Sequence, residues 1–156
     1  SVASRGLGDV YKRQALASCV LLAGCASQPG ELEETTWEVV AVYVDPSTPG
    51  GVTPDAAGRA VLAFGPSSIA VQTGCAPLQA RAEVSSDFVR LVEVKEGPLI
   101  DACQSGTRLL HNHLTSLLTE GSEFDIRSYG EDSPKELVMT KRTDAVDKPA
   151  LRLVAQ

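Results

Sequence analysis

The 156-residue chain is poor in histidine and in aromatic residues. It has two histidines, His111 and His113, and only 4% of its residues are aromatic. Its sequence lacks the Gly-x-Ser-x-Gly nucleophile elbow, the phosphate-binding P-loop and the glycine pattern of dinucleotide-binding folds. Spacing places no pair of its carboxylates in an apolar setting, which general acid–base catalysis needs. We therefore expect no catalytic residue, no cofactor and no enzymatic activity.

The two histidines do not predict a metal site. Two residues apart on a helix, their side chains point about 200° away from each other. Helical residues that share a metal ion are usually four apart. The run His111-Asn112-His113 matches a nuclease motif by its letters only, because the ββα-metal setting of that motif is missing. We expect both histidines to lie in solvent or at its boundary, and we expect no metal.

Basic residues are in the minority, and the chain has a formal net charge of −6. Residues 1–24 carry three basic residues and one acid, so the remainder has 11 basic and 19 acidic residues and a net charge of −8. Such a domain repels phosphate backbones and anionic headgroups. We therefore expect no nucleic-acid partner, and membrane attachment has to come from a lipid.

The apolar run at residues 15–23 is too short to cross a bilayer, which takes about 20 residues. Its length suits the core of a signal peptide, whereas a buried core helix is the alternative. The run ends in small residues directly before a cysteine, and the segment resembles a lipobox, where bacteria lipidate a cysteine and cut the chain before it. The lipobox comprises Leu22, Ala23 and Gly24, followed by Cys25 as the lipidated residue.

The lipobox divides the chain into three parts. Residues 1–24 are the predicted signal peptide, and residues 25–34 are the lipidated cysteine and a polar tether. Residues 9–14 resemble a translated sequencing adapter, so we expect residues 1–14 to include an artefact, with a native basic segment as the alternative. Residues 35–156 are then a single domain, displayed on the extracytoplasmic side of a bacterial envelope.

Eight segments of the domain have the composition or alternation of β-strands. One helix interrupts them, predicted from an apolar stripe formed by Leu110, Leu114, Leu117 and Leu118. One helix supplies at most one parallel crossover, so we expect a mainly β fold: an antiparallel meander curled into a small barrel-like sheet, with the helix packed on one side or end. The predicted strands are residues 36–44, 59–64, 68–73, 78–84, 88–94, 123–129, 136–140 and 150–154.

Two further local expectations concern the ends of the helix and the first loop. Asp101 with Gln104, or Ser105 alone, is expected to cap the start of the helix, and Gly121 is expected to end it. The loop at residues 45–58 is rich in proline and glycine, so it is either a binding loop or a tolerated insertion, and the insertion is favoured.

The cysteines reduce to one pair. Cys19 leaves with the signal peptide and Cys25 is used by the lipid, which leaves Cys75 and Cys103 in an oxidising compartment. We predict a disulfide between them that joins the sheet to the helix. Two buried free thiols are the alternative.

With the strands placed, the chain resembles the META domain, also called HslJ-like, over about residues 33–155. The resemblance is carried by the opening Thr36-Trp37-Glu38-Val39-Val40 strand, the Leu62-x-Phe64 strand, Gly74-Cys75, and Cys103 before a leucine-rich helix. Ala76 departs from the family, which usually has asparagine there, and the following Gly-x-Tyr is missing. The resemblance implies a small barrel-like fold on an envelope lipoprotein linked to stress tolerance, without a family-wide catalytic activity.

Two functions fit these expectations. The first is a non-enzymatic envelope lipoprotein that binds a protein or cell-wall partner through loops such as residues 45–58, or that supports envelope stress tolerance. The second is a barrel that carries a small apolar ligand in its interior. The bulk of the inward-facing side chains decides between the two functions. An interior filled by Trp37, Leu62, Phe64, Phe124 and the helix leucines leaves no room for a ligand.

Overall fold

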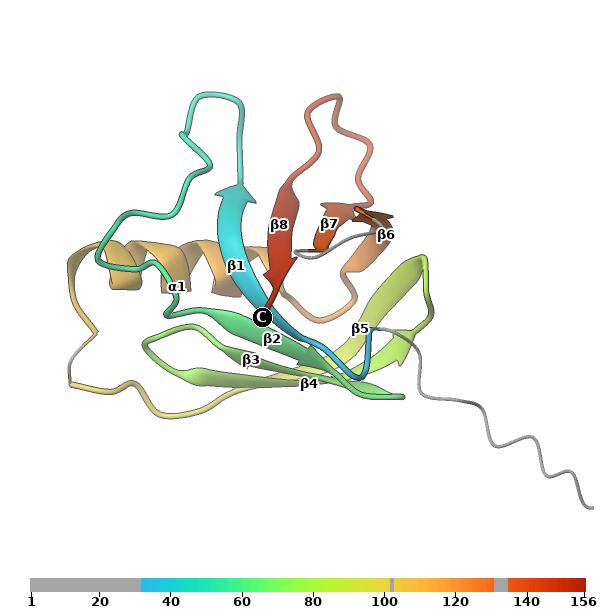
Figure 1. The fold of residues 1–156 in the computed structure, drawn as a ribbon, viewed down its shortest axis with the longest axis horizontal. Helices are drawn as coiled ribbons and strands as arrows, with labels where there is room; N and C mark the ends of the chain where they lie inside the picture. Colours follow the sequence, from blue (N-terminus) through green and yellow to red (C-terminus); the bar gives the residue numbers. More distant parts are fainter. Residues whose placement is uncertain (1–31, 102, 131–134) are drawn as a thin grey trace, which may run out of the picture.

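The computed structural model describes residues 32–101, 103–130 and 135–156 (Figure 1). The lipobox, Cys25 and most of the predicted tether lie outside the described residues. The described part forms eight strands and one helix, in the order that the sequence predicts. They are β1 (Thr36–Tyr43), β2 (Val61–Phe64), β3 (Ser68–Gln72), β4 (Pro77–Val84), β5 (Phe88–Glu96), α1 (Ser105–Leu117), β6 (Glu123–Tyr129), β7 (Glu136–Lys141) and β8 (Ala150–Ala155).

The strands form a closed antiparallel barrel in which each strand pairs with its neighbours in the sequence. The barrel closes where β1 pairs with β8, with Glu38 opposite Val154 and Tyr43 opposite Ala150. The connection from β5 to β6 contains α1, and the two strands still pair antiparallel over Phe88–Arg90. The predicted fold class is confirmed: a mainly β meander that closes on itself and so removes its edges.

Alternation along the strands turns one face of each strand inward. In β4, Leu78, Ala80 and Ala82 are buried whereas Arg81 is exposed, as a strand with one wet face requires. A register shift in β1 between Val39 and Ala41 interrupts this rule. After it Val42 is buried opposite Leu151, because an extra residue rotates the following side chains to the other face, whereas Ala41 is buried beside Gly51 of the next loop.

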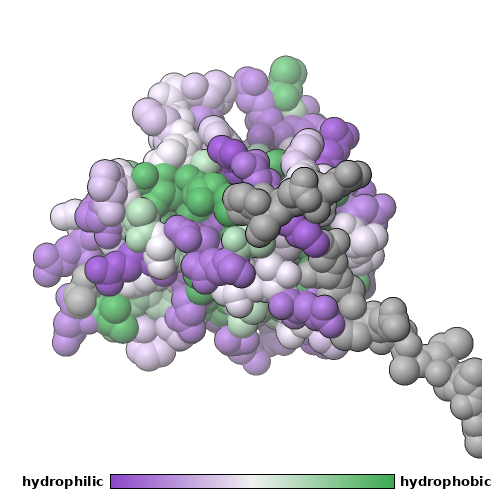
Figure 2. All heavy atoms as spheres, in the orientation of Figure 1, coloured by the Kyte–Doolittle hydropathy of each residue, from purple (hydrophilic) through white to green (hydrophobic). Residues whose placement is uncertain are grey.

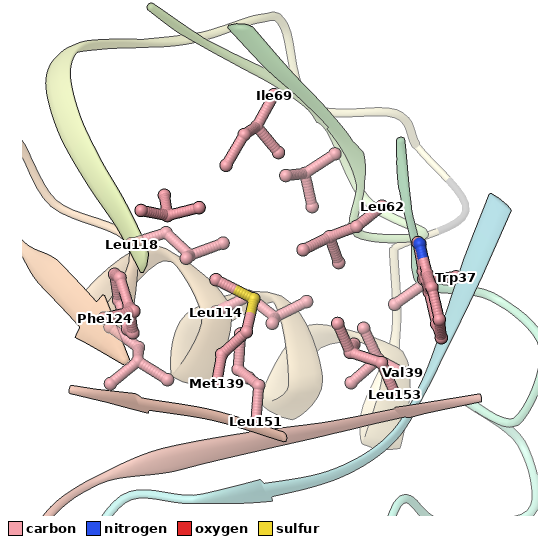
Figure 3. Close-up of a cluster of buried hydrophobic side chains, with 14 of the residues drawn as sticks. Trp37, Val39, Leu62, Ile69, Leu114, Leu118, Phe124, Met139, Leu151 and Leu153 are labelled. Atoms are coloured by element: carbon pink, nitrogen blue, oxygen red, sulfur yellow. The ribbon is translucent and has the colours of Figure 1, made fainter. Parts of the chain in front are cut away.

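Helix α1 packs its leucines into the barrel interior (Figure 3). Leu114 and Leu118 point toward the same space as Met139 and Leu151, and all four side chains are buried. The bulky residues expected to fill the interior are also buried: Trp37, Leu62, Phe64 and Phe124. Side chains therefore fill the interior, and a ligand placed there would have to displace the core.

The predicted disulfide is present. Cys75, in the turn between β3 and β4, is bonded to Cys103, two residues before α1, and their Cα atoms are 4.7 Å apart. The bond spans 28 residues of sequence, and closing such a loop limits the unfolded chain by about 3.5 kcal/mol in the chain-entropy account. It ties the helix to the sheet at the point where the helix begins.

The expected helix ends are wrong. Gln104 occupies the N-cap position without a side-chain hydrogen bond, so neither Asp101 nor Ser105 caps the helix. The helix ends at Leu117, and Gly121 lies further along in a turn, where its φ of +80° suits glycine. Among the described residues, no helix is long and apolar enough to cross a membrane.

Candidate functional site

The loop between β1 and β2, residues 44–60, is fixed to the body of the protein. At its first half, the Val42 backbone N–H donates to the Gly50 carbonyl oxygen at 2.7 Å. At its second half, the N–H of Ala56 donates to the Thr53 carbonyl oxygen in a tight turn, and Ala56 is buried in the core. The loop is thus a packed part of the fold.

Asp55 of this loop caps α1 from a distance. Its Oδ2 atom accepts a 2.9 Å hydrogen bond from the backbone N–H of Gly106, in the first turn of the helix. The hydrogen bond from the Thr53 side chain, followed by that from Gly106, lowers the pKa of Asp55 below its ordinary value. A carboxylate at this end also matches the positive end of the helix dipole. The cap that the sequence predicted locally therefore comes from the first loop.

A pocket of about 220 Å³ opens between this loop and α1. Val42 and Val52 line it from the strand and the loop, and Leu109, Leu110 and His113 line it from the helix. Leu109 is 50% exposed although it belongs to an apolar wall. Figure 2 shows hydrophobic side chains gathered where the loop passes over the helix. This apolar pocket can accept an apolar group from outside the barrel.

A second depression, which we name the Tyr43 cleft, lies on the other side of the same loop. It has a volume of about 400 Å³ and lies between the β1–β2 loop and the β7–β8 loop. Tyr43 lines it from the end of β1 and Asp45 from the first loop, whereas Val146, Asp147 and Lys148 line it from the second loop. Both loops project from the same end of the barrel (Figure 1).

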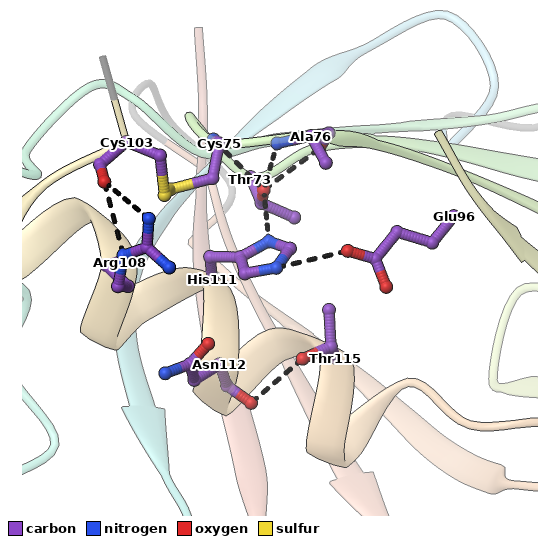
Figure 4. Close-up of polar contacts among 9 residues, drawn as sticks. All are labelled: Thr73, Cys75, Ala76, Glu96, Cys103, Arg108, His111, Asn112 and Thr115. Atoms are coloured by element: carbon purple, nitrogen blue, oxygen red, sulfur yellow. Dashed lines mark hydrogen bonds and ion pairs between the residues drawn. A yellow bond between two sulfur atoms is a disulfide. The ribbon is translucent and has the colours of Figure 1, made fainter. Parts of the chain in front are cut away.

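A polar cluster lies on the opposite face of α1, beside the disulfide (Figure 4). The Nδ1 atom of His111 is 2.8 Å from the hydroxyl oxygen of Thr73, and its Nε2 atom is 3.2 Å from a carboxylate oxygen of Glu96. The hydroxyl oxygen of Thr73 also accepts hydrogen bonds from the backbone N–H groups of Cys75 and Ala76. The cluster therefore connects α1 to the β3–β4 turn and to the end of β5.

The Thr73 hydroxyl uses all of its hydrogen-bonding capacity inside the cluster. Its oxygen accepts the N–H groups of Cys75 and Ala76. Its single proton has two acceptors within reach, the Ala76 carbonyl oxygen at 2.9 Å and Nδ1 of His111 at 2.8 Å.

Hydroxyl, imidazole and carboxylate in this order suggest a catalytic triad, but their burial argues against one. Thr73 has no solvent exposure, so no substrate can reach its oxygen. His111 is 6% exposed, and the expectation that both histidines lie near solvent is wrong for it. The cluster fastens the helix to the sheet. The described residues contain no group of three or more metal-binding side chains.

Of the residues that the sequence analysis did not identify, one had a recognisable pattern in the sequence and two did not. His111 stands three residues before Leu114 and seven before Leu118, which places it on the apolar stripe. That spacing could have identified it as buried. Asp55 and Tyr43 had no such sequence pattern, because their roles depend on segments about 50 and 100 residues further along the chain. Of the predicted site residues, Cys75 and Cys103 meet, and the lipobox residues lie outside the described ranges.

Comparisons with known proteins show the fold and little more. No protein-family model matches the chain, and no curated protein matches it. An NMR structure of a protein from Burkholderia xenovorans is similar, with a TM-score of 0.56 and 15% sequence identity. The match covers 80% of this chain and 83% of the other. At this identity the likeness concerns the fold alone.

The first testable consequence concerns Thr73. Thr73→Val keeps the shape of the side chain and removes the hydroxyl, which leaves His111 and two backbone N–H groups without their partner. We expect the free energy of unfolding to fall by about 1–3 kcal/mol. Urea unfolding measures it, with Thr115→Val as the control, because that hydroxyl bonds only within α1 near solvent. Equal losses in both variants would contradict the role of the cluster.

The second consequence concerns the pH dependence of the Asp55 cap. The pKa of Asp55 in the folded protein lies below its ordinary value of 3.8. The stabilisation by this carboxylate is therefore complete above about pH 3.8, and it is lost as the pH falls through the pKa of the folded state. Asp55→Asn should melt at a lower temperature than the wild type at pH 7, and the difference should shrink below pH 4. Thermal unfolding between pH 7 and pH 2 measures this. A gap that stays constant with pH would contradict it, and the exposed Asp144→Asn serves as the control.

Proposed function

We propose that the chain is a lipid-anchored protein of the bacterial envelope whose META-like barrel is non-enzymatic. In this proposal Cys25 carries the lipid, and the β1–β2 loop binds an envelope protein or a cell-wall partner. Support for the anchor comes from the lipobox at residues 22–25. Tolerance of envelope stress is the physiological role that the META resemblance implies.

The observation that carries the binding role is the placement of the β1–β2 loop. The loop is held by Asp55 at the helix and by backbone bonds at β1, and it lines both the apolar pocket and the Tyr43 cleft. A loop fixed in advance loses little conformational entropy when it binds, so its contacts contribute more fully to affinity.

The position of the loop also suits a protein anchored at its N-terminal side. Strand β1 begins at Thr36, next to the predicted tether, and ends at Tyr43, where the loop begins. The loop therefore lies at the far end of the strand from the proposed anchor (Figure 1). A partner in the envelope can then reach it without passing the membrane surface.

A ligand inside the barrel is not favoured. The core side chains that would surround it are packed together, and the largest of them have less than 2% exposure. An apolar ligand has a place in the pocket under the β1–β2 loop, outside the barrel. The proposal therefore concerns the outer surface of the protein.

The anchor is tested by Cys25→Ser. We expect the wild-type protein to sediment with membranes and to incorporate labelled palmitate, and we expect the variant to be soluble and unlabelled. Two or three acyl chains hold a protein stably, whereas loss of all of them removes the attachment. A variant that stays in the membrane pellet would contradict the proposed anchor.

The binding role is tested by a photo-cross-linker at Leu109, in the apolar pocket, and at Ser128, exposed on β6, as the control. In intact envelopes we expect adducts from position 109 and none from position 128. Protease treatment removes a protein adduct, and muramidase treatment removes a cell-wall adduct, so the two partner classes are distinguished. Equal adducts at both positions, or none at 109, would contradict the role of the loop.

A further inference from the structure

The Tyr43 cleft has a composition that differs from the apolar pocket. It combines an aromatic ring, two carboxylates, an ammonium group and a loop carrying Val146, which is 97% exposed. Its volume of about 400 Å³ lies in the usual range of small-ligand sites, roughly 300–1,000 Å³. The chemistry of these groups allows a ligand class to be named.

The ring of Tyr43 forms a fixed platform. A Cβ atom at Gly50 would overlap the ring, so the loop backbone lies directly against it, and the absence of a side chain there makes the contact possible. Gly50 is itself held, because its carbonyl oxygen accepts the N–H of Val42. The ring is nevertheless 46% exposed, which leaves surface for a ligand. An aromatic ring already held in place loses little entropy on binding.

The cleft is lined by two carboxylates, those of Asp45 and Asp147, and by the ammonium group of Lys148, so its net charge is −1. Asp45 is occupied by its own loop, because its carboxylate accepts hydrogen bonds from the Ser47 backbone and from the side chains of Ser47 and Thr48, which lower its pKa. Across the cleft, Asp147 and Lys148 contribute one charge of each sign. An anionic ligand would face Asp147, and a cationic ligand would face Lys148. A neutral ligand with hydroxyl groups meets both, because a hydroxyl donates to a carboxylate and accepts from an ammonium group.

We propose that the Tyr43 cleft binds a sugar ring of a neutral glycan. The ring of Tyr43 stacks against the C–H face of the sugar, and Asp147 and Lys148 take its hydroxyl groups. The inference rests on the proposed function, because it names the ligand class of the same β1–β2 loop. It selects a cell-wall type of partner over a charged peptide.

The test uses the full chain with Cys25→Ser, purified without lipid, and a soluble probe, the β-1,4-linked tetramer of N-acetylglucosamine. In ¹H–¹⁵N NMR spectra we expect shifts at Tyr43, Gly50 and Lys148, with an affinity that does not change between low and high salt. Tyr43→Ala should weaken binding about tenfold, the effect of losing one ring contact. Tyr43→Phe keeps the ring and should keep most of the affinity.

Tyr129→Ala is the matched control, since Tyr129 is also about half exposed but lies on β6, away from the cleft. Equal weakening in Tyr43→Ala and Tyr129→Ala would overturn the proposal, as would the absence of shifts in a folded protein. A salt-sensitive response to an oligolysine peptide at the same residues, without a response to the tetramer, would assign the cleft to a cationic peptide instead. Cross-linking at Leu109 that persists without glycan binding would leave the proposed function intact and overturn only this inference.

Discussion

The rest of the structure depends on the fastening of α1 to the turn between β3 and β4. The Cys75–Cys103 disulfide holds the segment before the helix, and the hydrogen bond between Thr73 and His111 holds its second turn. Through these two links the helix leucines are kept inside the barrel, where they complete the core. The helix start in turn positions the β1–β2 loop through Asp55. The core, the helix and the β1–β2 loop therefore all depend on the attachment of α1 to the β3–β4 turn.

Short-range patterns predicted most of the fold. Alternation in β4 and the apolar stripe of α1 depend only on neighbouring residues, and the antiparallel order follows from having one helix available for crossovers. The cysteine pair followed from the proposed processing of the chain. By contrast, the Asp55 cap and the Tyr43 cleft bring together segments far apart in sequence, and no local pattern records such meetings. His111 was different, because its spacing placed it among leucines.

The structure separates the residues that keep the fold from those that can bind. Buried polar groups such as Thr73 are satisfied by close partners and have no capacity left for a ligand. At the loops, by contrast, Tyr43 and Leu109 keep exposed apolar surface beside fixed backbone. A similar barrel at 15% identity indicates that the pattern of inward and outward residues can be met by very different sequences. The loops are free to vary on such a frame.

Strand β1 connects the two ends of the molecule along one continuous backbone. It starts at Thr36, on the side of the proposed anchor, and its last residue is Tyr43, the platform of the cleft. Its eight residues span about 26 Å when extended. A pulling force between the membrane and a bound ligand would therefore be transmitted through the covalent bonds of this one strand, which is hydrogen-bonded to β2 on one side and to β8 on the other. Because both points of load lie on the same strand, the covalent backbone of β1 carries the force, and the hydrogen bonds to β2 and β8 are not sheared.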